Sequence, residues 1–164
     1  MMMALGADQV IARDSVVLNP HYRTMGLYGS EYWTYLLPRR VGDRLTRTMT
    51  TECLPIGARE AVRTGLADLA VPGHGAQFDR AVSRFATQLA AGPGHGDQLA
   101  AKRDTRAAHE QERPLRSYRR AELDQMRLDI FADRNGFAQA RRRFLTSSAT
   151  PTPRSADEGR LRIG

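Results

Sequence analysis

NPHYRTMGLYGSEYWTYLLPRRVG (residues 19–42) is the stretch that decides the fold, because it joins a short strand region to the first long helix. It holds the only tryptophan of the chain, Trp33, and four of the five tyrosines. Aromatic residues make up 7% of the sequence, so their crowding here needs a structural or a chemical reason. Asn19-Pro20 ends the preceding strand, since a residue before proline is biased away from helix.

Tyr22 and Glu31 are the candidate chemical groups of this stretch. Tyr22 follows a predicted strand, where a side chain can point into a cleft. Ser30 is a plausible N-cap that places Glu31 in the first helical turn. A desolvated carboxyl group there could act as a general acid or base. On its own, the pattern favours a structural tyrosine and a glutamate that only suits the helix dipole, and Trp33 fits a core or interface position.

The sequence outside this stretch predicts short elements and then helices. Residues 9–12 and 15–18 read as two short strands joined by a tight turn. Helices are expected over 44–52 and over 58–64, the second ended by Gly65, and an apolar, strand-like segment covers 66–71. The fold class is therefore α/β, mainly helical, with two or three short strands.

The second half of the chain predicts helices over 76–91, 97–111 and from Pro114 onward. The last of these has an expected buried side of Leu115, Tyr118, Leu123, Met126 and Leu128. From Thr146 the composition predicts a disordered tail. The expected organisation is a core over 1–72, a helical region over 73–145 and a tail over 146–164.

The composition limits the classes of partner. The chain has 164 residues, enough for one domain with its own core, and a net charge of +7. All but one of its 25 basic residues are arginine, which is typical of a codon-composition bias. No nucleic-acid recognition module accompanies the charge, so we expect no nucleic-acid partner. The basic residues could instead bind the phosphate groups of a cofactor in one pocket.

Cysteine, histidine and hydropathy patterns bound the remaining possibilities. Cys53 is the only cysteine, so it reads as a small buried residue in a reducing compartment. The four histidines are scattered without ligand spacing, and no metal site is expected. No apolar run is long enough to span a bilayer and the start has no secretory pattern, so the expected location is the cytoplasm with no membrane association.

Four motifs together resemble the enoyl-CoA hydratase/isomerase (crotonase) superfamily: ALGADQVIA (4–12), LNP (18–20), LPRRVG (37–42) and AREAVRTGLAD (58–68). The octamer GSEYWTYL (29–36) is in addition similar to the C-terminal domain of HypX-type proteins, which mature nickel-iron hydrogenases. The likeness covers residues 1–145. It implies the C-terminal part of a crotonase-like fold.

The resemblance implies a chemistry. HypX-type proteins join an N-terminal half that depends on formyl-tetrahydrofolate to a crotonase-like half that binds coenzyme A. Together they would pass a formyl group through formyl-CoA and release carbon monoxide for the hydrogenase iron, so partners would be an acyl-CoA and hydrogenase maturation proteins. The resemblance makes Tyr22 and Glu31 catalytic and places His21, Tyr28, Ser30 and Trp33 around the substrate.

The sequence also departs from the hydratase pattern. Tyr22 stands where hydratases place one catalytic glutamate and Met2 where they place the other, so ordinary enoyl-CoA hydration is not expected. The Gly-Gly pair that supplies one oxyanion N–H would precede Met1, and the formyl-transfer half is missing. The resemblance thus implies an N-terminally truncated piece without activity of its own. A divergent enoyl-CoA hydratase/isomerase fragment and a non-enzymatic, arginine-rich interaction module remain alternatives, and the oligomeric state stays open.

Overall fold

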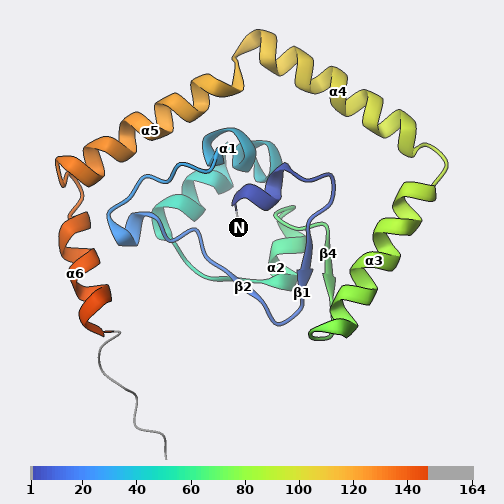
Figure 1. The fold of residues 1–164 in the computed structure, drawn as a ribbon, viewed down its shortest axis with the longest axis horizontal. Helices are drawn as coiled ribbons and strands as arrows, with labels where there is room; N and C mark the ends of the chain where they lie inside the picture. Colours follow the sequence, from blue (N-terminus) through green and yellow to red (C-terminus); the bar gives the residue numbers. More distant parts are fainter. Residues whose placement is uncertain (1, 148–164) are drawn as a thin grey trace, which may run out of the picture.

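The computed structural model describes residues 2–147, and over this range the protein is an α/β structure made mainly of helices. Figure 1 shows four C-terminal helices in an arch around a smaller N-terminal part that holds all the strands. The elements are, in chain order, η1 (Met2–Gly6), β1 (Ile11–Arg13), β2 (Val17–Leu18), η2 (Arg23–Met25), α1 (Trp33–Glu52), β3 (Ile56–Gly57), α2 (Ala58–Arg63), β4 (Leu69–Val71), α3 (Ala76–Ala91), α4 (His95–Glu112), α5 (Leu115–Phe131) and α6 (Phe137–Ser147).

The two predicted N-terminal strands and the turn between them exist, but the strands do not pair with each other. β1 pairs in parallel with β4, with Ile11 opposite Leu69. β2 pairs antiparallel with β3, with Leu18 opposite Ile56. The Asp14 N–H continues the first ladder by donating to the Val71 carbonyl oxygen at 3.0 Å. The turn therefore redirects the chain from one long-range partner to another.

Helix α1 consists of two helical segments joined at Gly42, and the second contains the helix expected over 44–52. Gly42 has φ 78° and ψ 163°, which is not helical backbone. Such a positive φ suits glycine because it has no Cβ to clash. The second segment then runs to Glu52, and Cys53 follows it as a buried residue, as predicted.

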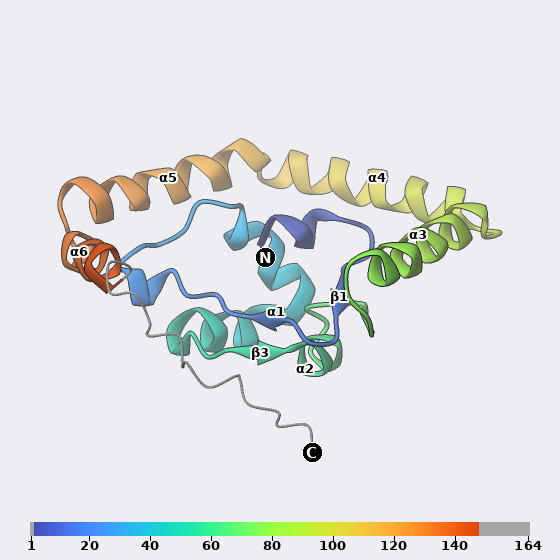
Figure 2. The ribbon, with the colours of Figure 1, turned by 60° about the horizontal axis from the view of Figure 1, so that its bottom comes forward.

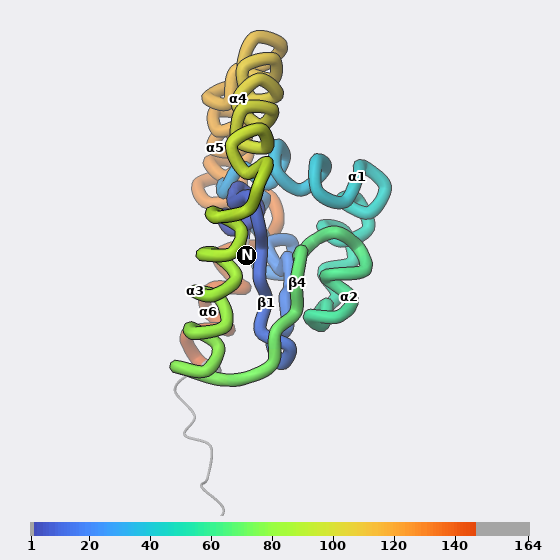
Figure 3. The backbone as a smooth tube through the Cα atoms, turned by 90° about the vertical axis from the view of Figure 1, so that its right-hand side faces the viewer, coloured from blue at the N-terminus to red at the C-terminus, as the bar shows by residue number. Residues whose placement is uncertain are grey.

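The apolar core lies within the N-terminal part. Its fully buried side chains come from η1, α1 and the segment around α2, and they include Met2, Leu37, Ala61 and Leu66. Burial of this kind is the largest favourable contribution to folding. Strands β1 and β4 lie between the arch and the helices α1 and α2 (Figure 3).

The arch contributes almost nothing to that core. Helices α3 and α4 contain no buried residue, and the buried residues of α5 are Glu122 and Asp129. Figure 2 shows α4 and α5 end to end along one side of the N-terminal part. The prediction that Leu123 and Leu128 face inward is wrong, since they are 40% and 45% exposed while the two acids are 0% exposed.

Helix α6 extends two residues beyond the expected start of the tail. Thr146 and Ser147 belong to α6, and the Thr146 hydroxyl donates to the Arg142 carbonyl oxygen at 3.1 Å. The rest of the predicted tail, 148–164, lies outside the described residues. No helix within residues 2–147 combines the length and the apolar character that a membrane span needs.

Candidate active site

Tyr22 and Glu31 come together as a hydrogen-bonded pair. The Tyr22 hydroxyl donates to Glu31 Oε2 at 2.6 Å. Between them the chain turns at Gly29, which has φ +91° and leaves room for the Tyr22 ring. A Cβ at Gly29 would lie 2.8 Å from that ring, closer than real side chains approach. The Tyr22–Glu31 hydrogen bond therefore depends on a glycine at position 29.

The surroundings of Tyr22 keep its phenol protonated. Burial is the largest influence that raises the pKa of Tyr22, followed by the hydrogen bond to Glu31 and by the negative charges of Glu31 and Glu122. All of these disfavour the phenolate. Tyr22 is thus a proton donor to the carboxylate of Glu31 across the physiological pH range.

A pocket of about 430 Å³ lies beside this pair. We call it the tyrosine pocket; it is lined by Pro20, Tyr22, Arg23, Gly26, Leu27, Tyr28, Trp33, Thr50, Thr51 and Asn135. Its volume is within the range of small-molecule sites. Three of the six predicted site residues, Tyr22, Tyr28 and Trp33, therefore share one pocket.

The other predicted site residues lie outside its lining. Glu31 reaches the pocket through Tyr22. His21 is exposed, and its Nδ1 lies 3.0 Å from the Asn19 carbonyl oxygen. Ser30 is half-buried and does not line the pocket. The roles assigned to these residues stay predictions.

Trp33 lines the tyrosine pocket and carries an unpartnered donor. Its ring lies 5.1 Å from that of Tyr28, measured between centroids. Its indole Nε1 is buried and has no hydrogen-bond partner among residues 2–147. Buried polar groups almost always have a partner, so an acceptor atom on a ligand would relieve this one.

Helix α1 is capped by a residue from the arch and not by Ser30. The helix begins at Trp33, after Tyr32 in a left-handed conformation with φ 57°. Glu122 of α5 accepts the Tyr32 N–H at 2.8 Å, the Thr34 N–H at 2.9 Å and the Thr34 hydroxyl at 2.6 Å. A carboxylate suits this place because the first N–H groups of a helix lack partners and the dipole is positive there. The Ser30 cap prediction is therefore wrong.

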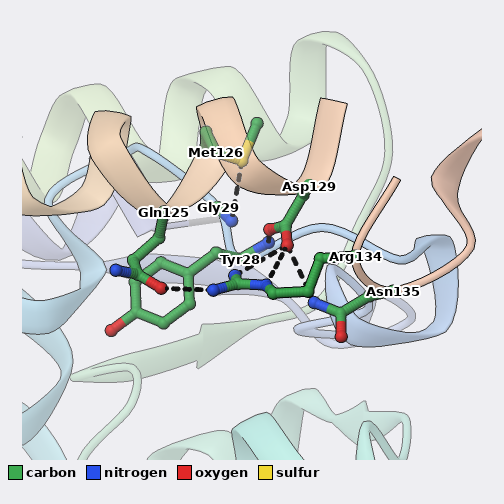
Figure 4. A network of polar contacts seen from close by, with 7 residues as sticks. All are labelled: Tyr28, Gly29, Gln125, Met126, Asp129, Arg134 and Asn135. Atoms are coloured by element: carbon green, nitrogen blue, oxygen red, sulfur yellow. Dashed lines mark hydrogen bonds and ion pairs between the residues drawn. The ribbon is translucent and has the colours of Figure 1, made fainter. Parts of the chain in front are cut away.

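Asp129 fixes the other end of the same loop (Figure 4). One carboxylate oxygen accepts the Tyr28 N–H at 2.7 Å. The other accepts Arg134 Nε at 3.0 Å, Arg134 Nη2 at 2.7 Å and Asn135 Nδ2 at 2.8 Å. Between the two acids, Met126 Sδ lies 3.2 Å from the Gly29 nitrogen. One face of α5 thus holds the backbone from Tyr28 to Thr34.

Sequence reasoning missed these two acids because it assigned the buried side of α5 to apolar residues. A signal was present: residues 115, 118, 122, 126 and 129 follow helical spacing, with the acids seven positions apart. Leu123 and Leu128 fall outside that stripe. The pattern could not show which groups donate to these acids. The donors to Glu122 are backbone N–H groups about ninety positions earlier in the chain.

The fold agrees with the comparisons to known proteins. The sequence profile of the enoyl-CoA hydratase/isomerase family matches residues 1–145, and the chain belongs to this family. Within the family the likeness is to the hydrogenase maturation proteins. Hydrogenase maturation factor HoxX of Bradyrhizobium diazoefficiens is 44% identical over 145 residues, which are 87% of this chain and 25% of HoxX.

Solved structures agree with the sequence match. HypX from Aquifex aeolicus in complex with tetrahydrofolic acid has a TM-score of 0.80 and 31% identity, over 94% of this chain and 27% of HypX. An enoyl-CoA hydratase/isomerase from Pseudoalteromonas atlantica shares the fold, with a TM-score of 0.71 and 20% identity over 92% of this chain and 58% of that one. The chain thus spans about a quarter of the length of the HoxX and HypX relatives.

Proposed function

We propose that this chain supplies the crotonase-like part of a hydrogenase maturation enzyme, in which the tyrosine pocket holds the formyl thioester of coenzyme A. The observation that carries the proposal is the Tyr22–Glu31 hydrogen bond of 2.6 Å at the edge of that pocket. The likeness to HoxX supports the hydrogenase context. The family supports a coenzyme A thioester as the class of ligand.

The proposed reaction is the decarbonylation of formyl-CoA to carbon monoxide and free coenzyme A. The formyl C–H bond breaks, its electron pair stays on carbon as the C–S bond breaks, and the thiolate leaves. The formyl proton passes to the Tyr22 oxygen while the phenol's own proton moves to Glu31, because Tyr22 and not Glu31 lines the pocket. The proton finally neutralises the thiolate, so no oxidant or reductant is needed.

In this scheme Tyr22 orients the formyl group and Glu31 acts as the base that accepts a proton through it. Trp33 supplies a donor to the ligand through its unpartnered Nε1. The tetrahydrofolate-dependent step belongs to the longer relatives, since HypX is the protein that was solved with tetrahydrofolic acid. Contacts with other maturation proteins are proposed on the same grounds.

The activity test uses a chimera in which residues 1–145 replace the matched segment of HoxX. Carbon monoxide release is measured by haem absorbance with formyl-CoA supplied. Glu31→Gln and Tyr22→Phe should each lower the rate about 10²-fold or more, the usual share of a proton-transfer group. Tyr118→Phe is the matched control, because Tyr118 lies on α5 outside the pocket.

Unchanged carbon monoxide release in both variants would exclude the pair from the reaction. Binding is tested separately in the 164-residue chain. Trp33 is its only tryptophan and lines the pocket, so its fluorescence should change on titration with acetyl-CoA, a stable thioester. A flat titration would argue against a thioester in this pocket.

A further inference from the structure

A second and larger pocket is lined by residues of η1, the first half of α1 and α4. Its volume is about 680 Å³. We call it the arginine pocket; it is lined by Leu5, Gly6, Ala7, Tyr32, Tyr35, Leu36, Arg39, Arg40, Lys102, Thr105, Arg106, His109 and Leu115. The two pockets share no lining residue. It therefore needs an explanation separate from that of the tyrosine pocket.

The lining of the arginine pocket is one-sided in charge. It has four Lys and Arg side chains and a histidine, and no aspartate or glutamate. Two of the cations have acidic partners beside the pocket: Lys102 pairs with Asp8, and Arg40 pairs with Asp68 at 2.5 Å. Arg39 and Arg106 have no ion-pair partner in the part of the chain that the structure describes. The pocket thus keeps a net positive charge.

Tyr35 holds these unpaired cations in place. Its buried ring lies 4.0 Å below the Arg39 guanidinium carbon, and Arg39 Nη1 donates to the Tyr35 carbonyl oxygen at 2.9 Å. Its hydroxyl accepts Arg106 Nη1 at 2.9 Å and lies 3.1 Å from His109 Nδ1. A cation on an aromatic face and in a hydrogen bond has lost much of its side-chain freedom before any ligand arrives.

The two unpaired guanidinium groups, Arg39 and Arg106, keep unused donors. A guanidinium carries five N–H groups. Arg39 and Arg106 spend one nitrogen each on Tyr35, and Arg40 Nε is buried without an acceptor among the described residues. Planar guanidinium groups match the oxygens of phosphate in paired hydrogen bonds. Apolar side chains, among them Leu36 and Leu115, complete the lining.

We propose that the arginine pocket binds a phosphate-bearing ligand of mononucleotide size. The phosphate oxygens accept from Arg39 and Arg106, and the ring of the ligand lies on the apolar side formed by Leu36 and Leu115. The volume fits such a ligand, since sites of this kind have roughly 300–1,000 Å³. The site is independent of the tyrosine pocket and of the function proposed for it.

The first test is calorimetric titration of the whole 164-residue chain with ADP and, in parallel, with adenosine. ADP should bind at one site with a Kd in the range of about 1–100 μM, and adenosine, which lacks the phosphates, should bind at least about tenfold more weakly. Failure of ADP to reach saturation by about 1 mM would overturn the proposal. Equal binding of adenosine would overturn it too.

Two variants of α4, each of which removes one positive charge, distinguish binding at a specific site from attraction to the overall charge of the protein. Arg106→Gln should weaken ADP binding about tenfold or more, the value of a charge-assisted hydrogen bond. Arg103→Gln, on the same helix but exposed and outside the lining, should change it by less than about twofold. Equal losses in both variants would show that ADP responds only to overall charge, against the proposal.

Two further measurements test the proposal even if Arg106→Gln alters the fold. Tyr35→Phe keeps the ring and removes only the hydroxyl that positions Arg106 and His109, so ADP binding should weaken severalfold. Amide NMR shifts should change at Arg106 and Tyr35, while the indole signal of Trp33 stays in place. Shifts centred on Trp33 would assign ADP to the tyrosine pocket and contradict the proposal.

Discussion

The N-terminal part and the arch are held together by different physics. The N-terminal part buries leucine, methionine and alanine side chains from η1, α1 and α2. The arch buries two carboxylates on α5, and both accept backbone N–H groups of the loop that carries the candidate site. Apolar burial is non-directional, whereas hydrogen bonds fix distance and angle.

The difference shows what the arch does for the site. Apolar contacts favour burial but do not fix the distances and angles between particular atoms, as hydrogen bonds do. Glu122 and Asp129 instead hold the segment from Tyr28 to Thr34 at two points, one on each side of Glu31. The position of Glu31 relative to Tyr22 therefore depends on a helix about ninety residues further along the chain.

The largest expected effect comes from removing the same side chain in the two regions. Leu66→Ala should destabilise the protein by about 2–5 kcal/mol, because Leu66 is fully buried and a cavity would remain. Leu123→Ala on the arch, 40% exposed in the native chain, should cost only about 0.5 kcal/mol. Urea denaturation followed by circular dichroism measures both. Similar losses in the two variants would show that Leu123 makes stabilising apolar contacts, and that the arch is not held by hydrogen bonds alone.

A smaller effect is expected at the hydrogen-bonded attachment. Glu122→Ala should cost about 2–3 kcal/mol, since three hydrogen bonds to a buried carboxylate are lost. Hydrogen exchange at the Tyr32 and Thr34 amides should accelerate. Asp124→Ala removes an exposed carboxylate of the same helix and should leave these amides protected. If Glu122→Ala also left them protected, α5 would not be the cap of α1.

The smallest effect concerns an ion pair inside the N-terminal part. Partial burial raises the pKa of the Asp68 carboxyl, but the hydrogen bonds from Arg40 and the Val10 N–H outweigh it and lower that pKa below its usual value. A carboxyl group whose pKa is lower in the folded than in the unfolded protein contributes stability at pH values above its unfolded pKa, which is about 3.9. That stability is lost as the pH falls through the folded pKa.

Asp68→Asn should therefore cost about 1 kcal/mol at pH 7, since the pair is partly exposed, and should flatten the fall in stability between about pH 5 and pH 3. Thermal unfolding across that pH range measures it. Asp14→Asn, an exposed aspartate without an ion-pair partner among residues 2–147, is the control and should leave the curve unchanged. An unchanged curve in Asp68→Asn would mean that other carboxyl groups cause the acid sensitivity.

Local elements could be predicted from the sequence because local physics sets them. The helix over 76–91 follows from apolar residues at helical spacing, and the end of α2 follows from Gly65, which has φ +78°. Strand partners were beyond reach, because β1 and β4 lie more than fifty residues apart and are too short to carry a register signal.

Part of the candidate site could be anticipated in the same way. The sequence predicts Tyr22 just after a strand and Glu31 in the first turn of a helix. The structure joins the two side chains by a hydrogen bond of 2.6 Å, although α1 begins only at Trp33. The cap of α1 could not be anticipated, since Ser30 fits the local rule and Glu122 competes with it from ninety residues away. A local preference yields when a buried charge must find hydrogen-bond donors.

The sequence by itself determined the helices, the loop that carries Tyr22 and Glu31, and the family, because these rest on neighbouring residues and recognisable motifs. Only the tertiary structure decided which strands pair, which face of α5 is buried and that Tyr35 gathers Arg39, Arg106 and His109 around one pocket. The reason is physical: pairing, burial and the gathering of charge are properties of residues far apart in the chain, and their energies exist only once the chain has folded.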